Sequence, residues 1–349
     1  MKYLLIFPLV AIILIASIRL QSTLKPKSVI THDEPIFASN APTEQAAEYS
    51  VSAWIADYDT VRAIEAFSEN SDSFEEIMPV VFKLDEDLSV DLTDFINVDR
   101  VQRIAQEGDI KVIASISNEL DGVRVHRFLN NKEAVDAGVD KIVEYLESFN
   151  FDGIDLDFEN IPVEDRENYV IFIRSLRQKL GNKKKLSVAV HAQIVDQETG
   201  QNLVEIGKLA DTVRVMAYDF HSTETGAGSI IGIDTLQKVL DISSAKIPTE
   251  KIALCLPTYG YDWSNNNAYS MQYNEIEDVI LNHPESNVKI DLRSHSKHLV
   301  YYIGKVKHDV WFEDAETLAR KIDFAKKYDL RQFCFWRLGG EDTRIWEIF

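Results

Sequence analysis

The sequence predicts an α/β fold, a closed (β/α)8 barrel with a small insertion after its seventh strand. From Tyr49 onward, short apolar runs alternate with amphipathic helical segments, and this alternation is typical of a parallel sheet. Eight such runs are enough for the sheet to close on itself. In one run, Phe151–Asn160, carboxylates occupy one face and aliphatic side chains the other. The 349 residues accommodate one barrel of about 250 residues together with additional segments.

The N-terminal 25 residues have the form of an export signal. Lys2 precedes the apolar run Tyr3–Ile18, and Arg19 follows it. The run is shorter than the about 20 residues that span a membrane comfortably, and no clean small-x-small cleavage site follows it. A cleaved signal peptide and an uncleaved membrane anchor therefore both stay open. Residues 26–48 are polar and aperiodic, which indicates a linker. Either alternative predicts an extracytoplasmic protein, secreted or membrane-anchored.

Residues 49–349 are predicted to form the (β/α)8 TIM barrel. Its strands are expected at Ser50–Ile55, Ile77–Phe82, Lys111–Ile116, Gly153–Phe158, Leu186–His191, Thr212–Tyr218, Ile252–Pro257 and Gln332–Trp336. Helices are expected at Val61–Ser68, Val98–Gln106, Lys132–Ser148, Val163–Leu180 and Ala315–Lys327. Pro162 and Gly181 flank the fourth helix as start and stop signals. The strand-like runs His298–Ile303 and Val306–Phe312 predict the insertion after strand seven.

Charge and cysteine content narrow the classes of ligand. With 37 basic and 57 acidic residues, the chain has a net charge of −20. Such a surface repels nucleic acid, anionic lipid and phosphate-rich substrates, so a neutral substrate is expected. Cys255 and Cys334 lie in apolar runs and are expected to be two buried small hydrophobic residues rather than a disulfide. No Cys/His pattern has metal-ligand spacing, so neither a metal nor another cofactor is predicted.

The acidic face of the fourth strand is the strongest chemical signal. Asp155, Asp157 and Glu159 point into the barrel, because side chains alternate along a strand. They lie about 7 Å apart, and in a dry pocket one of them should keep its proton near neutral pH. These three acids, Asp155, Asp157 and Glu159, are called the acidic file below. Glu159 is the last of them along the strand and has the longest side chain, which makes it the candidate general acid. Taken alone, this cluster also suits a calcium site or helix caps.

Aromatic and acidic residues dominate the other strand ends. Aromatic faces beside hydrogen-bonding acids suit a sugar. No second acid is obviously placed across the barrel as a nucleophile, and in substrate-assisted hydrolases the N-acetyl carbonyl of the sugar takes that part. His191 and His221 are expected to be structural or rim residues. The candidate substrate-binding residues at these ends are Trp54, Asn118, Met216, Asp219, Tyr259 and Trp336.

Three motifs resemble those of glycoside hydrolase family 18, the chitinase-like family. Asp152-x-x-Asp155-x-Asp157-x-Glu159 is similar to the family signature, Met216-x-Tyr218-Asp219 to its strand-six motif, and Trp336 to its strand-eight tryptophan. The resemblance extends from about Tyr49 to the C-terminus. The strings Phe335–Asp342 and Leu256–Trp263 look closest to the bacterial branch with spore-cortex-lytic N-acetylglucosaminidases.

The resemblance implies a role for each residue of the motifs. Glu159 would protonate the leaving oxygen and then deprotonate water, and Asp157 would hold the acetamido N–H. Asp155 would share a proton with Asp157, Tyr218 would bond the acetamido oxygen, and Asp219 would support the site. Side chains alternate along a strand, so Asp152 and Phe158 lie on the face opposite to the inward acids. Asp152 is therefore expected to be structural and Phe158 to face outward.

One motif departs from the family pattern. Ser115-Ile116-Ser117-Asn118 stands where the family has Ser-x-Gly-Gly, and Asn118 is expected either to contact sugar or to order its loop.

The resemblance predicts an exported, retaining glycoside hydrolase that cleaves β-linked N-acetylglucosamine glycans of the peptidoglycan or chitin type. The expected partner is such a glycan, with no nucleic acid and with the chain as a monomer. The alternative is a catalytically silent glycan-binding protein, a lectin or scaffold, of the same fold. Loss of the acid is the usual way for such relatives to fall silent, so the presence of Glu159 favours the enzyme.

Overall fold

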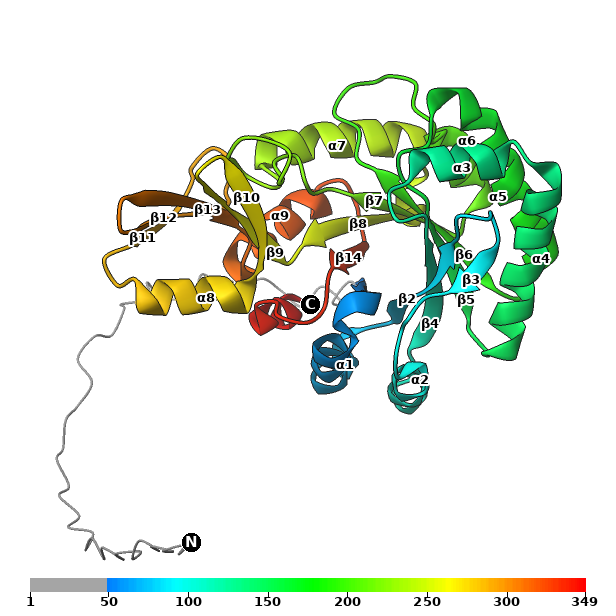
Figure 1. Ribbon diagram of the computed structural model, residues 1–349, viewed down its shortest axis with the longest axis horizontal. Helices are drawn as coiled ribbons and strands as arrows, with labels where there is room; N and C mark the ends of the chain where they lie inside the picture. The colour runs from blue at the N-terminus through cyan, green and yellow to red at the C-terminus, as the bar shows by residue number, and fades with distance from the viewer. Residues whose placement is uncertain (1–48) are drawn as a thin grey trace, which may run out of the picture. The chain divides into compact units, whose positions relative to one another are not determined.

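Eight parallel strands close into a barrel in the computed structural model, which describes residues 49–349 (Figure 1). Around the barrel the order is β1, β2, β4, β5, β6, β7, β8 and β14, and β14 pairs with β1 to complete the ring. The predicted TIM barrel is confirmed, and all eight predicted strands are present. Their bounds are β1 Ser50–Ile55, β2 Glu76–Leu84, β4 Lys111–Ser117, β5 Gly153–Asp157, β6 Lys185–His191, β7 Thr212–Met216, β8 Ile252–Pro257 and β14 Gln332–Trp336.

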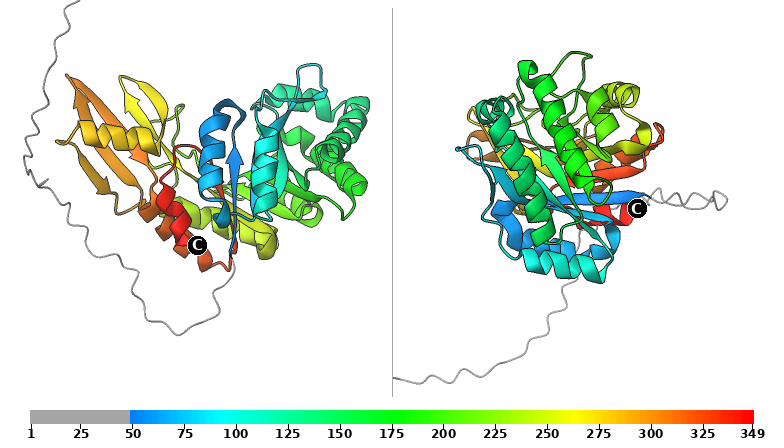
Figure 2. Two further views of the ribbon diagram at one scale, coloured as in Figure 1. Left: turned by 90° about the horizontal axis from the view of Figure 1, so that it is seen from below. Right: turned by 90° about the vertical axis from the view of Figure 1, so that its right-hand side faces the viewer.

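Helices cover the outer surface of the barrel, with α4 and α5 side by side (Figures 1 and 2). Their bounds are α1 Thr60–Glu69, α2 Val98–Glu107, α3 Gly122–Leu129, α4 Lys132–Ser148, α5 Arg166–Leu180, α6 Leu203–Leu209, α7 Ile233–Lys246 and α9 Ala315–Lys326. Outward side chains of the strands pack beneath them, and Phe158 stacks on Phe172 of α5 with ring centroids 5.8 Å apart. The predicted outward orientation of Phe158 is therefore confirmed.

The predicted insertion after the seventh barrel strand is present, and it is an antiparallel sheet with one helix. Beyond the two strands predicted for it, the insertion contains three further strands and the helix. Its strand order is β10, β9, β13, β12, β11, and the sheet and α8 stand together on one side of the barrel (Figures 1 and 2). Ile276 of α8 packs on Leu299 and Phe312, which gives the insertion a small core of its own. The bounds are β9 Tyr259–Ser264, β10 Asn267–Gln272, α8 Tyr273–Asn282, β11 Asn287–Ile290, β12 Lys297–Ile303 and β13 Val306–Phe312.

A short strand and several 3-10 turns join these elements, and the predicted N-terminal segments lie outside the described residues. A short strand β3, Val90–Leu92, pairs antiparallel with the end of β2. The helix predicted at Val163–Leu180 begins as one 3-10 turn, Val163–Asp165, before α5. The predicted export segment 1–25 and linker 26–48 fall outside the described residues. Within 49–349, no helix combines the length and apolarity that crossing a membrane requires.

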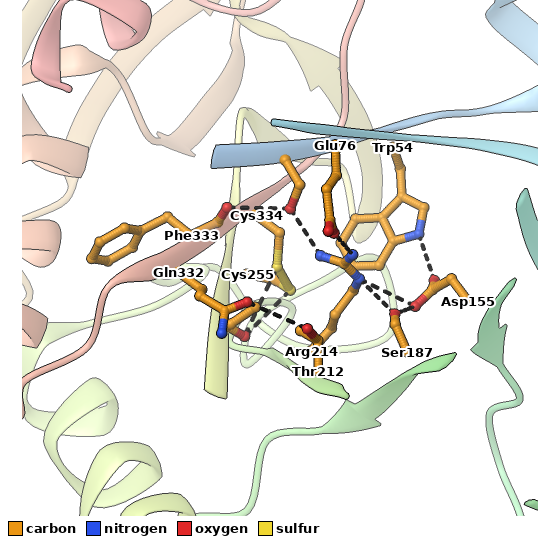
Figure 3. Close-up of a disulfide and its surroundings, with 12 residues drawn as sticks. Trp54, Glu76, Asp155, Ser187, Thr212, Arg214, Cys255, Gln332, Phe333 and Cys334 are labelled. Atoms are coloured by element: carbon orange, nitrogen blue, oxygen red, sulfur yellow. Dashed lines mark hydrogen bonds and ion pairs between the residues drawn. A yellow bond between two sulfur atoms is a disulfide. The ribbon is translucent and has the colours of Figure 1, made fainter. Parts of the chain in front are cut away.

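The expectation that the two cysteines are unpaired is wrong. Cys255 of β8 and Cys334 of β14 stand directly opposite each other in the parallel pair and form a disulfide, with Cα atoms 4.2 Å apart (Figure 3). Both are fully buried, as expected. They are 79 residues apart in sequence, on the seventh and eighth strands of the barrel, which pair directly. The register that sets the two cysteines opposite each other, and not their sequence spacing, shows the pairing.

The disulfide should contribute measurably to stability. Cross-linking a loop of this length restricts the unfolded chain, so reduction should lower the free energy of unfolding by about 2–4 kcal/mol. Urea unfolding with and without reductant measures this, and the double variant Cys255→Ala/Cys334→Ala should show no reductant effect. Two titratable thiols in the denatured, unreduced protein would contradict the pairing.

Candidate active site

Asp155 lies at the bottom of the acidic file, completely buried inside the barrel. In the strand register, Ser115 of β4 and Ser187 of β6 lie beside Asp155. Both serine hydroxyls donate to its carboxylate, and the bond from Ser115 is 3.2 Å long. Trp54 Nε1 donates from β1 across 3.1 Å, and Arg214 Nε from β7 across 3.2 Å. Donors from four other strands therefore converge on Asp155, so this carboxylate acts as an acceptor.

Arg214 joins Asp155 to a second buried acid. Its guanidinium is 1% exposed and lies between Asp155 on one side and Glu76 on the other (Figure 3). It donates to Glu76 Oε2 and to Ser52 Oγ, each across 2.8 Å. Burial raises the pKa of Glu76, but the cations of Arg214 and Lys185 outweigh it and hold that pKa below its ordinary value. A paired charge network thus fills the barrel beneath the site.

Sequence reasoning missed Arg214. Its position in the strand could have identified it. Arg214 alternates with Val213 and Val215, so it shares the inward face of the strand with Met216. A charged residue on that face requires a buried counter-ion. Its partner Glu76 precedes it by 138 residues, so closure of the barrel was needed to identify the pair.

Asp157 is the second acid of the file and is buried without full hydrogen bonding. Its Oδ1 atom has no hydrogen-bond partner among the described residues. Burial, followed by the charges of Glu159 and Asp155, raises the pKa of Asp157 well above its ordinary value. Burial therefore favours the protonated form of Asp157, and its Oδ1 atom is available to a ligand. A buried unpaired oxygen of this kind is costly unless a ligand completes its bonding.

Glu159 lies two residues after the end of β5, with its side chain 21% exposed. Burial, and secondly the charge of Asp219, raises the pKa of Glu159 to about 7. Its backbone is held at both ends by the Asn118 amide: Glu159 N–H donates to Oδ1 across 2.8 Å, and Nδ2 donates to Glu159 O across 3.0 Å. Of the two roles expected for the buried Asn118, the structure shows the ordering of the loop.

Tyrosines from the insertion complete the opposite side of the site. Asp219 follows β7 with a left-handed φ of 59°, and its Oδ1 accepts from Tyr259 OH across 2.5 Å and from Tyr261 OH across 2.9 Å. Burial raises the pKa of Asp219 although both phenols oppose the rise. The ring of Tyr218 meets Tyr259 edge-on at 6.4 Å. The Tyr259 hydroxyl thus donates to Asp219, and Tyr261, which was not among the candidate binding residues, donates to the same oxygen.

The tryptophans predicted to bind substrate have different surroundings. Trp336 ends β14, is partly buried and meets Trp54 edge-on at 5.9 Å. Trp54 itself is 0% exposed, so it offers no surface to a ligand, and its contact with Asp155 indicates a positioning role instead. Met216 is 5% exposed and packs with both rings inside the barrel. Asp152 accepts from the Val112 N–H across 2.8 Å, which is the structural role expected for it.

A pocket of about 240 Å³ opens beside Glu159. It is formed by the loops after β5 and β6, and its lining residues include Asn160, His191, Gln193, Thr199 and Gln201. The Nε2 atom of His191 lies 3.3 Å from Glu159 Oε2. The structure therefore brings the three acids, Tyr218 and Asp219 together with a histidine expected only at the rim.

Curated relatives of the chain include proteins named as glycosylases, cortical fragment-lytic enzymes and chitinases. The chain is 30% identical over 261 residues to the uncharacterized glycosylase YvbX of Bacillus subtilis (strain 168), covering 70% of this chain and 75% of that protein. It is 24% identical over 221 residues to the cortical fragment-lytic enzyme of Bacillus anthracis, covering 60% of this chain and 51% of that enzyme. The chain thus spans about half of the latter relative.

Solved structures share the fold. The spore cortex-lytic enzyme SleL of Bacillus cereus superimposes with a TM-score of 0.81 at 19% identity, covering 88% of this chain and 75% of that chain. A chitinase of Chromobacterium violaceum ATCC 12472 gives a TM-score of 0.79 at 23% identity, covering 86% and 97%. The family model "Glycosyl hydrolases family 18" matches residues 73–341. Together with the barrel and its acidic file, this match shows that the chain belongs to glycosyl hydrolase family 18.

Proposed function

We propose that this glycoside hydrolase is exported and cleaves β-linked N-acetylglucosamine in glycans of the peptidoglycan or chitin type, with retention of anomeric configuration. The observation that carries the proposal is the pair of neighbouring acids, Glu159 and Asp157, whose burial favours their protonated forms. Glu159 has a pKa of about 7 at the mouth, and below it Asp157 has a raised pKa and an unpaired oxygen. Such a pair supplies an acid for the leaving group and a polar partner for an acetamido group.

The chemistry follows from these positions. Glu159 transfers its proton to the glycosidic oxygen while the substrate's acetamido carbonyl oxygen attacks the anomeric carbon. Asp157 accepts the acetamido N–H and stabilises the positive charge of the ring that forms, with Asp155 as its partner. Tyr218 OH donates to the acetamido oxygen. Glu159, now a carboxylate, removes a proton from the water that opens this ring, and two displacements at the same carbon restore the β configuration.

Export and substrate class rest on further support. The apolar run Tyr3–Ile18 has the form of an export signal or membrane anchor, and a disulfide such as Cys255–Cys334 is typical of proteins in oxidising compartments. The relatives named as cortical fragment-lytic enzymes and chitinases favour glycans that contain N-acetylglucosamine. The partly buried Trp336 provides an aromatic face for a sugar ring. The chain is proposed to act as a monomer.

The direct test incubates the full-length protein with chitooligosaccharides and with purified peptidoglycan. We expect shorter products whose new reducing end is initially β by NMR, and inhibition by a thiazoline mimic of the cyclic intermediate. Glycan binding without turnover of any N-acetylated glycan would contradict the proposal and support a lectin-like role. An initial α product, or failure of the thiazoline to bind, would contradict participation of the acetamido group.

Asn118 provides a second prediction, because its amide holds the backbone of Glu159 at both ends. Asn118→Ala removes both bonds and should lower kcat by about 10²-fold through misplacement of the acid, with KM changed less than about threefold. Steady-state kinetics measure this. The matched control is Asn282→Ala, at an exposed helix end where the amide bonds only Asp278 O. Equal kcat values for the two variants would refute the role.

A further inference from the structure

His191 is placed against the candidate acid by rigid elements. It is the last residue of β6, and its Nε2 atom lies 3.3 Å from Glu159 Oε2. The backbone N–H of His191 donates to Gln201 Oε1 across 2.8 Å. The buried Gln201 amide also donates to Phe158 O at 3.1 Å and to Ala189 O at 3.2 Å. One amide therefore ties the end of β5 to the end of β6 and sets the spacing between His191 and Glu159.

The other titratable groups around Glu159 are acids or a phenol. Asp157 approaches from β5, and Asp219 and Tyr218 approach from the segment after β7. In the described part of the chain, His191 is the one basic side chain within 4 Å of the Glu159 carboxyl. Half of its side chain is exposed, toward the pocket beside Glu159.

The protonation state of the imidazole decides what it does to the acid. A neutral ring with its proton on Nε2 donates to one carboxyl oxygen and leaves the other free to carry the acid proton. A cationic ring would favour ionised Glu159 and so remove the acid. Partial desolvation lowers the pKa of His191, whereas burial and the Asp219 charge raise that of Glu159 to about 7. Both shifts favour a protonated acid beside an uncharged ring.

We propose that His191 is a positioning residue for Glu159: its uncharged imidazole donates to Oε2 and turns the protonated Oε1 toward the glycosidic oxygen. This inference rests on the proposed hydrolase function. It assigns His191 no proton transfer to the substrate, and Glu159 remains the acid. The consequence is a pH optimum with an acidic limb set by His191 and an alkaline limb set by Glu159.

The kinetic test compares wild type, His191→Gln and His191→Phe across pH. Glutamine places an amide donor near the position of Nε2 without titrating, so kcat should stay within about threefold and activity should extend to lower pH. Phenylalanine fills the space without a donor, so kcat should fall about tenfold with KM little changed. The control is His283→Phe, in the insertion, where the His283 ring packs at a tilt against Tyr301; this variant should match wild type. Wild-type kcat in His191→Phe, or equal losses in both His191 variants, would overturn the proposal.

A second measurement needs no turnover and separates this inference from the proposed function. The Glu159 carboxyl is titrated by NMR in the wild type and in His191→Phe. Because a neutral imidazole that donates to Oε2 favours the ionised carboxyl, removing the donor should raise the apparent pKa of Glu159. Identical titration curves would overturn the coupling whether or not a substrate is hydrolysed. Absence of hydrolysis by wild type, with the shift present, would count against the proposed function alone.

Discussion

Glu159→Gln is expected to lower kcat by about 10²–10⁴-fold, with KM changed by less than about threefold. Glutamine fills the same space but cannot protonate the leaving oxygen or take a proton from water. Initial rates on chitooligosaccharides measure the loss. Glu164→Gln is the matched control, because this exposed acid follows the same strand and lies away from the acidic file. Equal turnover by wild type and Glu159→Gln would mean that another group is the acid.

The same residue predicts how activity depends on pH. The first step requires protonated Glu159, and its pKa is raised to about 7 by burial and by Asp219. A raised pKa keeps the proton on the carboxyl to higher pH, so kcat/KM should fall as pH rises through about 7. An ordinary glutamate would already have lost most of its proton near pH 5. Asp219→Asn removes the neighbouring charge and should move this limb to lower pH.

The barrel and the acidic file were predictable because both follow from local patterns. Strand alternation depends on neighbouring residues alone, so it placed Asp155 and Asp157 inward and Phe158 outward before any tertiary contact was known. The features that were not predicted depend on contacts between strands that are distant in sequence. Cys255 meets Cys334 because the register of β8 against β14 sets them directly opposite each other, and spacing alone does not give that register.

The roles of Trp54 and Asn118 also depend on contacts between residues distant in sequence, so local patterns did not predict them. Trp54 appeared from sequence to be an aromatic strand-end residue available to a sugar. In the folded chain its ring points into the barrel and its N–H is used on Asp155, which lies 101 residues further along the chain. Asn118 likewise spans 41 residues to reach Glu159. Sequence patterns identified residue types suited to sugar chemistry, whereas the division between ligand contact and support required the distances.

Arg214→Met is expected to lower the free energy of unfolding by about 3–5 kcal/mol, because it leaves Asp155 and Glu76 buried with too few partners. Methionine retains much of the volume, so the loss reports on charge more than on packing. Urea unfolding followed by circular dichroism measures it. The control Arg320→Met breaks an exposed helix pair with Glu316 and should cost at most about 1 kcal/mol.

A partner substitution separates charge from packing in this prediction. If the unpaired charge of Glu76 causes part of the loss, Glu76→Gln should cost less in the Arg214→Met background than in wild type, with a coupling of about 0.5–3 kcal/mol. Additive losses would mean that Arg214 acts through packing. Arg214 also donates to Asp155 at the bottom of the acidic file. Its removal should therefore misplace this carboxylate as well as destabilise the barrel, and kcat of the folded fraction should fall as well.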